Sequence, residues 1–148
     1  MPLRERDLLP PVAAHFLGLG YEVFEEVEIA GRWADLVATG AEDVVAVELK
    51  MQAWRTAVRQ AMAYQLGADH SYVALPLWRA QEAYRSRHAF EREGIGMLAV
   101  DPRGAVRTIL RAAASPRQMP LLNEDIRATL GAGRRVALNA HVRGALPS

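Results

Sequence analysis

The stretch RWADLVATGAEDVVAVELKM, residues 32–51, places two strand-like runs on either side of four turn-forming residues. Residues 32–39 and 43–51 are rich in Val and Ala and carry short polar interruptions, a pattern that predicts two β-strands. The segment from Gly40 to Asp43 has the length and composition of a hairpin loop. We therefore expect an antiparallel β-hairpin at the centre of the fold.

The segments on either side of this hairpin extend the pattern. Residues 4–20, 53–68 and 78–94 have helical spacing of apolar residues, whereas residues 21–29, 70–76 and 96–101 resemble strands. Pro10 and Pro11 mark a kink or a late start in the first helix. The order αβββαβαβ predicts an α/β domain with a mixed central sheet flanked by helices.

Two regions along the chain differ in the strength of this pattern. Residues 1–115 carry all of the predicted core elements, and Ser115-Pro116 marks the point after which the signal weakens. Residues 116–148 contain more Arg than acidic residues and predict a basic extension with one or two short helices. We expect a domain over 1–115 followed by this extension.

The composition limits the class of protein. The chain has 148 residues, 51% of them hydrophobic, no cysteine and a formal charge of +1. This excludes thiolate metal sites and disulfides, and the fraction of apolar residues is that of a folded domain. The charged N-terminal segment and the lack of a run of about 20 apolar residues favour a cytoplasmic protein that does not enter a membrane.

Strand parity predicts that two acidic side chains meet on the hairpin. If Thr39 pairs with Val44, then Asp35 lies opposite Glu48, with the two Cβ atoms roughly 5 Å apart, and Lys50 lies beside them. Opposed carboxylates destabilise a sheet unless a cation compensates their charge. Mg²⁺ accepts one or two carboxylates together with water and phosphate oxygens, so a divalent metal site is expected here.

Lys50 is the only lysine in the chain, and the other 17 of the 18 strongly basic residues are arginines. An ammonium group is a compact charge on a flexible stem and loses its proton more readily than a guanidinium. A lysine at this position therefore favours a role beside a metal-bound water over a simple need for positive charge. Arg55 and Arg59 follow on the next predicted helix and are candidate contacts to DNA phosphates.

The ordered set of Asp35, Glu48-Leu49-Lys50 and the helical segment from Gln60 to Tyr64 resembles the motifs of the PD-(D/E)xK nuclease superfamily. Ala34-Asp35 stands where that family usually has Pro-Asp, and the QxxxY spacing of Gln60 and Tyr64 is similar to the RecB-like branch. The motifs cover residues 35–64, and the order of elements is similar from about residue 3 to 111. The resemblance implies a restriction-endonuclease-like core.

The resemblance also implies roles for single residues. Asp35, Glu48 and the main-chain carbonyl of Leu49 would bind Mg²⁺ or Mn²⁺, and Lys50 would assist the attacking water in phosphodiester hydrolysis. Gln60 and Tyr64 would reach the DNA or that water. The expected protein is a metal-dependent deoxyribonuclease, and two-strand cleavage by a domain of this size would favour a homodimer.

Other interpretations stay open at the level of sequence. Glu48 and Lys50 are also compatible with a solvated strand end, and Gln60 and Tyr64 with core packing. Glu5 matches an extra acidic ligand of some relatives, or is a solvated residue at a helix end. A non-catalytic DNA-binding or assembly module with the same fold, or a nuclease acting on RNA, would fit the same motifs.

Overall fold

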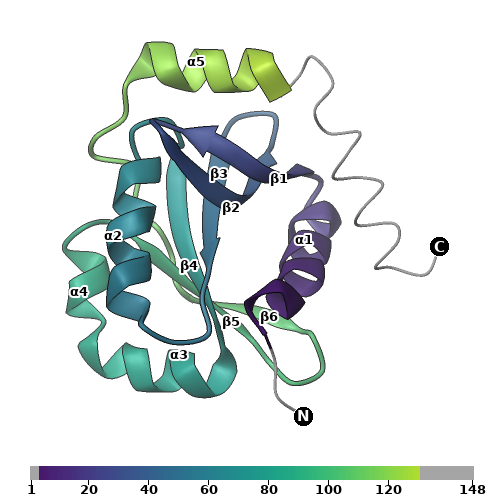
Figure 1. The fold of residues 1–148 in the computed structure, drawn as a ribbon, viewed down its shortest axis with the longest axis vertical. Coiled ribbons are helices and arrows are strands. Elements are labelled where there is room, and N and C mark those ends of the chain that lie inside the picture. Colours follow the sequence, from purple (N-terminus) through teal and green to yellow (C-terminus); the bar gives the residue numbers. More distant parts are fainter. Residues whose placement is uncertain (1–3, 131–148) are drawn as a thin grey trace.

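The computed structural model describes residues 4–130 as six strands and the helices that surround them (Figure 1). The strands are β1 (Glu22–Ile29), β2 (Arg32–Thr39), β3 (Val44–Leu49), β4 (His70–Pro76), β5 (Gly96–Val100) and β6 (Val106–Leu110). The helices are η1 (Glu5–Leu8), α1 (Leu9–Gly18), α2 (Trp54–Tyr64), α3 (Leu77–Ala83), η2 (Tyr84–Ser86), α4 (His88–Glu91) and α5 (Pro120–Thr129).

The six strands form one mixed sheet whose spatial order, β1-β2-β3-β4-β5-β6, is the order of the chain. β3, β4 and β5 are parallel neighbours, and the other pairs are antiparallel. The parallel pairs need crossovers, which α2 supplies between β3 and β4 and the α3–α4 segment supplies between β4 and β5. The predicted α/β class with a mixed, helix-flanked sheet is confirmed.

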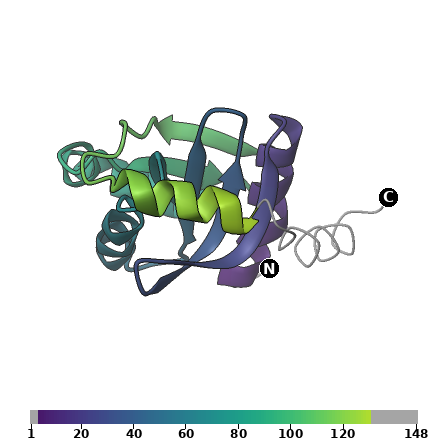
Figure 2. The same ribbon diagram turned by 90° about the horizontal axis from the view of Figure 1, so that it is seen from above.

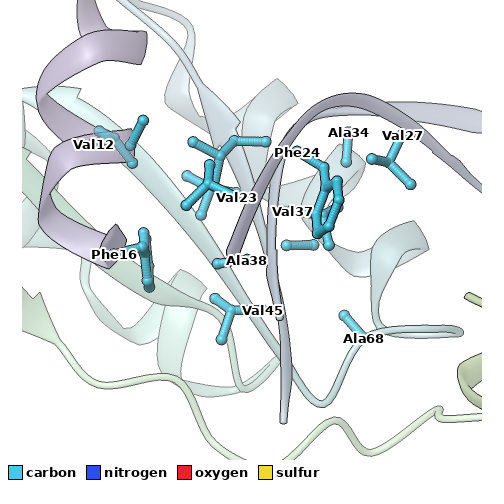
Figure 3. Packing of buried hydrophobic residues seen from close by; sticks show 14 of the residues in the cluster. Val12, Phe16, Val23, Phe24, Val27, Ala34, Val37, Ala38, Val45 and Ala68 are labelled. Carbon is cyan, nitrogen blue, oxygen red and sulfur yellow. The ribbon is translucent and has the colours of Figure 1, made fainter. Parts of the chain in front are cut away.

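Two buried clusters hold the helices on the sheet. Val12 and Phe16 of α1 pack near Val23, Ala38 and Val45 on one side (Figure 3). On the other side, α2, α3 and α4 pack on β4 and β5 through a second cluster that consists of Ala57, Val58, Ala61, Val73, Leu75, Ala80, Ala83, Phe90, Ile95, Met97 and Ala99. The small residues of α2 allow this helix to approach the strands closely.

Three boundaries differ from the sequence predictions. The first helix begins as the 3-10 turn η1, and α1 starts at Leu9 with its prolines in the first turn, where the missing N–H groups cost nothing. The single helix predicted over 78–94 is wrong, because it is divided into α3, η2 and α4. Residues 106–110, for which the sequence suggested no element, form the edge strand β6.

Helix α5 belongs to the part of the chain predicted as a basic extension, and it lies across the ends of strands (Figure 2). Ile126 and Leu130 join the same buried cluster as α1 and β1 to β3. The Asp69 carboxylate accepts hydrogen bonds from Gln118 and Arg127 at 2.7 and 2.9 Å. The first part of the predicted extension thus contains a helix that packs against the sheet domain; the rest of it, residues 131–148, lies outside the described part.

None of the helices described between residues 4 and 130 has the length and apolar character needed to cross a membrane.

Candidate metal and catalytic site

The register of the β2–β3 hairpin is the predicted one. Thr39 pairs with Val44 across the loop, and regular pairing continues to Leu36 opposite Val47. The next pair in this register would be Asp35 and Glu48, but regular pairing stops one step before it. Instead, the Leu49 N–H donates a 2.8 Å hydrogen bond to Asp35 Oδ2. The carboxylate of Asp35 is therefore held against the backbone of β3, beside Glu48.

The strand on the other side of Asp35 is also irregular. Glu25 pairs with Leu36 and Val27 pairs with Ala34, while Glu26, between them, has a φ of 51° and takes no part in the regular pairing. A residue other than glycine in this left-handed region costs about 1 kcal/mol or more. Asp35 thus lies at a point where the sheet is locally opened toward both neighbours.

Helix α2 supplies the group that holds Glu48. The Tyr64 hydroxyl lies 2.7 Å from Glu48 Oε1 and 2.8 Å from the carbonyl oxygen of Trp33, and its single hydrogen can be donated to only one of them at a time. Tyr64 is 1% exposed and Glu48 is 6% exposed. The contacts of Tyr64 with Glu48 and Trp33 therefore bring α2, β3 and β2 together at one buried point.

Burial and mutual repulsion set the charges of the two carboxyl groups. Burial and, second, the negative charge of Asp35 together raise the pKa of Glu48 to about 7, although the Tyr64 hydroxyl and Lys50 oppose this rise. Burial also raises the pKa of Asp35, against the hydrogen bond from Leu49 N–H. The pair therefore tends to retain one proton near neutral pH, as expected for two carboxyl groups that share a site.

Lys50, which directly follows the end of β3, lies near this pair. Its Nζ is 3.8 Å from Glu5 Oε1, a distance typical of a weak, partly solvated ion pair, and its main-chain N–H donates to the Ala74 carbonyl of β4. Its positive charge lowers the pKa of both Asp35 and Glu48. The ammonium is thus placed where it acts on the carboxylate pair through its charge.

A cavity of about 210 Å³ opens next to Asp35. Its lining consists of Glu5, Arg6, Leu9, Glu25, Glu26, Asp35 and Leu49. Glu48 and Lys50 do not line it, so Asp35 and Leu49 are the motif residues that a ligand in the cavity would meet first. The strongly acidic lining favours a cation as part of that ligand.

The other predicted residues have different surroundings. Gln60, one turn before Tyr64 on α2, buries its Oε1 atom without a hydrogen-bond partner in the described structure. Arg55 and Arg59 are exposed on α2; the Arg55 guanidinium lies 4.3 Å from the centre of the Trp54 ring, and Arg59 bonds the Thr56 hydroxyl at 3.3 Å. Neither arginine is in an ion pair within the described range.

Sequence reasoning gave too little weight to three acidic residues. Glu5 is on η1, 30 residues before Asp35, and Glu25 and Glu26 are on β1. All three line the cavity beside Asp35. Only the three-dimensional return of η1 to the end of β3 brings Glu5 to Lys50, and no local pattern reveals that contact.

The available oxygen donors suit a hard cation, although they are few. Across residues 4–130, no group of three or more His, Cys, Asp or Glu side chains has the arrangement of a metal site. Asp35, Glu48 and the carbonyl of Leu49 would supply the oxygen donors that Mg²⁺ and Mn²⁺ prefer, and water or phosphate oxygens would complete the coordination. The repulsion between the carboxylates is the structural observation that such a cation would relieve.

Comparison with solved structures finds a similar fold. A protein of unknown function from Silicibacter pomeroyi, SPO1766, superposes with a TM-score of 0.68 and 22% sequence identity, over 94% of both chains. At this level of identity the match shows a shared α/β fold. No protein-family model and no curated protein sequence matches the chain.

Proposed function

We propose that the protein is a metal-dependent nuclease that hydrolyses phosphodiester bonds of DNA. The observation that supports it most directly is the pairing of the partly buried Asp35 with the buried Glu48 at the end of the β2–β3 hairpin, where burial and then the charge of Asp35 raise the pKa of Glu48 to about 7. Bringing two acids together out of water costs stability, and groups with such raised pKa values are candidates for a functional site.

The role that we propose for each residue follows from its contacts. Asp35, fixed by Leu49 N–H, faces the cavity and would bind the metal together with Glu48, whose orientation Tyr64 fixes. When bound, Mg²⁺ would lower the pKa of a water molecule and neutralise charge on the phosphate. Lys50, beside the pair, would orient that water or contact a phosphate oxygen.

The order of the secondary-structure elements also supports this proposal, because it matches the order expected from the resemblance to PD-(D/E)xK nucleases. A helix, three antiparallel strands, a crossover helix and a parallel strand occur in the order that the resemblance implies, with Asp35 on the second strand and Glu48 on the third. We propose on this basis that the sheet and its helices form a restriction-endonuclease-like core. The buried contact of Tyr64 with Glu48 gives the QxxxY spacing a physical role.

One observation favours a second candidate, a DNA-binding module without catalytic activity. Glu48 is 6% exposed and lies outside the lining of the cavity beside Asp35, so a metal would have to reach it from the Asp35 side. A module that kept the fold would bind DNA without needing that access. A nuclease acting on RNA would differ from the proposed enzyme in its substrate alone.

Cleavage and melting measurements test the proposal. Supercoiled, linear, single-stranded and branched DNA, and single-stranded RNA, would be incubated with the protein in Mg²⁺, Mn²⁺ or EDTA. We expect metal-dependent cleavage of DNA that Asp35→Asn abolishes and that Asp125→Asn, a change at an exposed position of α5, leaves intact.

The same variants separate metal binding from catalysis. A ligand that binds only the native state raises the melting temperature as its concentration rises. Wild type and Asp125→Asn should show that rise with Mg²⁺ or Mn²⁺, and Asp35→Asn should not. DNA binding without cleavage of any substrate would establish the binding module instead, and an identical metal response of all three proteins would refute the site.

A further inference from the structure

A second and larger cavity, of about 280 Å³, lies on the face of the sheet that α1 crosses. Val45 of β3 is part of its lining, four residues before Leu49 at the candidate metal site. Four residues of a strand span roughly 13 Å, so the two cavities are separate. No residue lines both of them.

Hydrogen bonds hold the polar wall of this cavity in place. The Asp43 carboxylate accepts from the Tyr21 hydroxyl at 3.0 and 3.1 Å and lies 3.2 Å from Nδ1 of His70. Because Asp43 accepts both contacts, Nδ1 of His70 is the donor, and Nε2 has no partner in the described part of the chain. Burial and Asp43 raise the pKa of Tyr21 to about 12, which keeps the phenol protonated as a donor.

Two glycines provide the space for these side chains. A Cβ atom at Gly40 would lie 2.9 Å from the ring of Tyr21 and 3.0 Å from Asp43 Oδ1. A Cβ atom at Gly96 would overlap the ring of Tyr72, which also lines the cavity. Any larger residue would displace these rings, so the wall depends on glycine at both positions.

The charges of the lining favour an anion. Asp43 is the acidic residue of this lining, and its oxygens are already engaged by Tyr21 and His70. Arg111, just after β6, lines the same cavity and makes no hydrogen bond or ion pair to the residues between 4 and 130. A guanidinium without a partner is a ready bidentate donor to a phosphate.

The remaining lining favours a planar ring. His15, Phe16, Tyr21 and Tyr72 contribute ring surfaces, and the Phe16 and Tyr21 rings meet edge to face at 5.5 Å. Aromatic side chains stack on nucleobases of any type, and a ring nitrogen such as His70 Nε2 can bond the edge of a base. The volume suits one small ligand and would not hold several nucleotides.

We propose that this cavity binds a single nucleotide, with its phosphate at Arg111 and its base among the aromatic rings. The nucleotide is either free in solution or the terminal nucleotide of a nucleic-acid strand, because both present the same ring and phosphate. This site is independent of the proposed nuclease chemistry, and it would give the protein a second contact to the product or the end of its substrate.

Calorimetric titration tests the site in EDTA, so that the candidate metal site does not contribute. Deoxyadenosine monophosphate, deoxyadenosine and inorganic phosphate would be compared. We expect the monophosphate to bind at least about tenfold more tightly than either part alone, since it uses both halves of the cavity. No binding of the monophosphate at millimolar concentration, or equal binding of phosphate alone, would overturn the proposal.

Variants locate the binding. Arg111→Gln and Tyr72→Leu should each lower the affinity for the monophosphate by about tenfold or more. Arg103→Gln, at an exposed turn outside the cavity, should leave the affinity unchanged. Equal weakening by Arg103→Gln would show diffuse attraction to basic residues and refute the site. Asp35→Asn should bind the monophosphate as wild type does, so a failed nuclease assay and a failed nucleotide assay are distinguishable.

Oligonucleotides distinguish the two sources of the ligand. Short single strands with a 5′-phosphate, a 3′-phosphate or neither would be titrated into wild type and Arg111→Gln. A preference for one phosphorylated end that Arg111→Gln removes assigns the cavity to a strand terminus. Binding of the free monophosphate with no dependence on the oligonucleotide end assigns it to a free nucleotide.

Discussion

Replacing Glu48 by Gln should stabilise the metal-free protein above neutral pH and leave its stability unchanged in acid. Glu48 has a folded pKa of about 7 against an ordinary value of 4.5. A carboxyl group with a raised pKa binds its proton more tightly in the folded state, so its contribution to stability is complete below about pH 4.5 and is lost as pH rises through 7. Glutamine, which does not titrate, avoids that loss.

The expected magnitude follows from the shift. A difference of about 2.5 pKa units corresponds to about 3 kcal/mol at 1.36 kcal/mol per unit. Solvent that enters the cavity beside Asp35 screens part of it, which leaves about 2 kcal/mol. For a domain of this size each kcal/mol changes the melting temperature by about 2–4 °C, so Glu48→Gln should melt about 4–8 °C above wild type at pH 8.

The measurement is a set of thermal melts in EDTA between pH 4.5 and 8, with wild type, Glu48→Gln and Glu91→Gln. Glu91 is an exposed glutamate of α4, and its change should not alter the pH dependence. Other groups, such as Asp69 with its lowered pKa, titrate in all three proteins and cancel in the differences. A difference between wild type and Glu48→Gln that is the same at pH 4.5 and pH 8 would refute the argument for a strained carboxylate pair.

Three further predictions concern other parts of the structure. Lys50→Arg and Lys50→Ala should both bind metal and DNA but lose at least about tenfold in single-turnover cleavage, because the attacking water is no longer oriented toward the phosphate. Full cleavage by Lys50→Arg would show that Lys50 supplies only a positive charge. Gln60→Leu removes a buried acceptor that has no partner in the described structure, so the melting temperature should stay the same or rise while cleavage falls. A variant that is destabilised but fully active would assign Gln60 to core packing. Asp69→Ala leaves the Val44 N–H and the Gln118 side-chain amide without their acceptor, removes the ion pair with Arg127 of α5, and should cost about 2 kcal/mol or more. Hydrogen exchange should increase only in α5 and at the start of β4, and a uniform increase would contradict this local role.

The strongest sequence prediction was the hairpin, and its physical basis explains why it held. Apolar residues on both sides of a four-residue loop fix the register, because a slip by one residue would turn the buried side chains of β2 to the wrong face. The approach of Asp35 to Glu48 followed from that register. What the register could not predict is that regular pairing ends there and that Leu49 N–H turns to the Asp35 side chain.

The parts that sequence could not provide depend on distant contacts or on weak patterns. Glu26 takes a left-handed conformation although it is neither Gly nor Asn, so no composition signal marks it. β6 has an edge position with Arg107 and Thr108 exposed, which weakens the alternation by which strands are found. Tyr64 was compatible with packing and with function; in the structure it is buried, and its hydroxyl reaches Glu48.

The agreement between strand order and chain order has a consequence for how the sheet is built during synthesis. Each new strand can join the free edge left by the one before it, and no strand has to enter between two that are already paired. Domains fold from the N-terminus as the ribosome extends the chain, so β1 to β3 can form a local three-stranded unit first. Asp35 and Glu48 would then meet on the ribosome before α2 emerges, and the arrival of Tyr64 would be the step that covers Glu48.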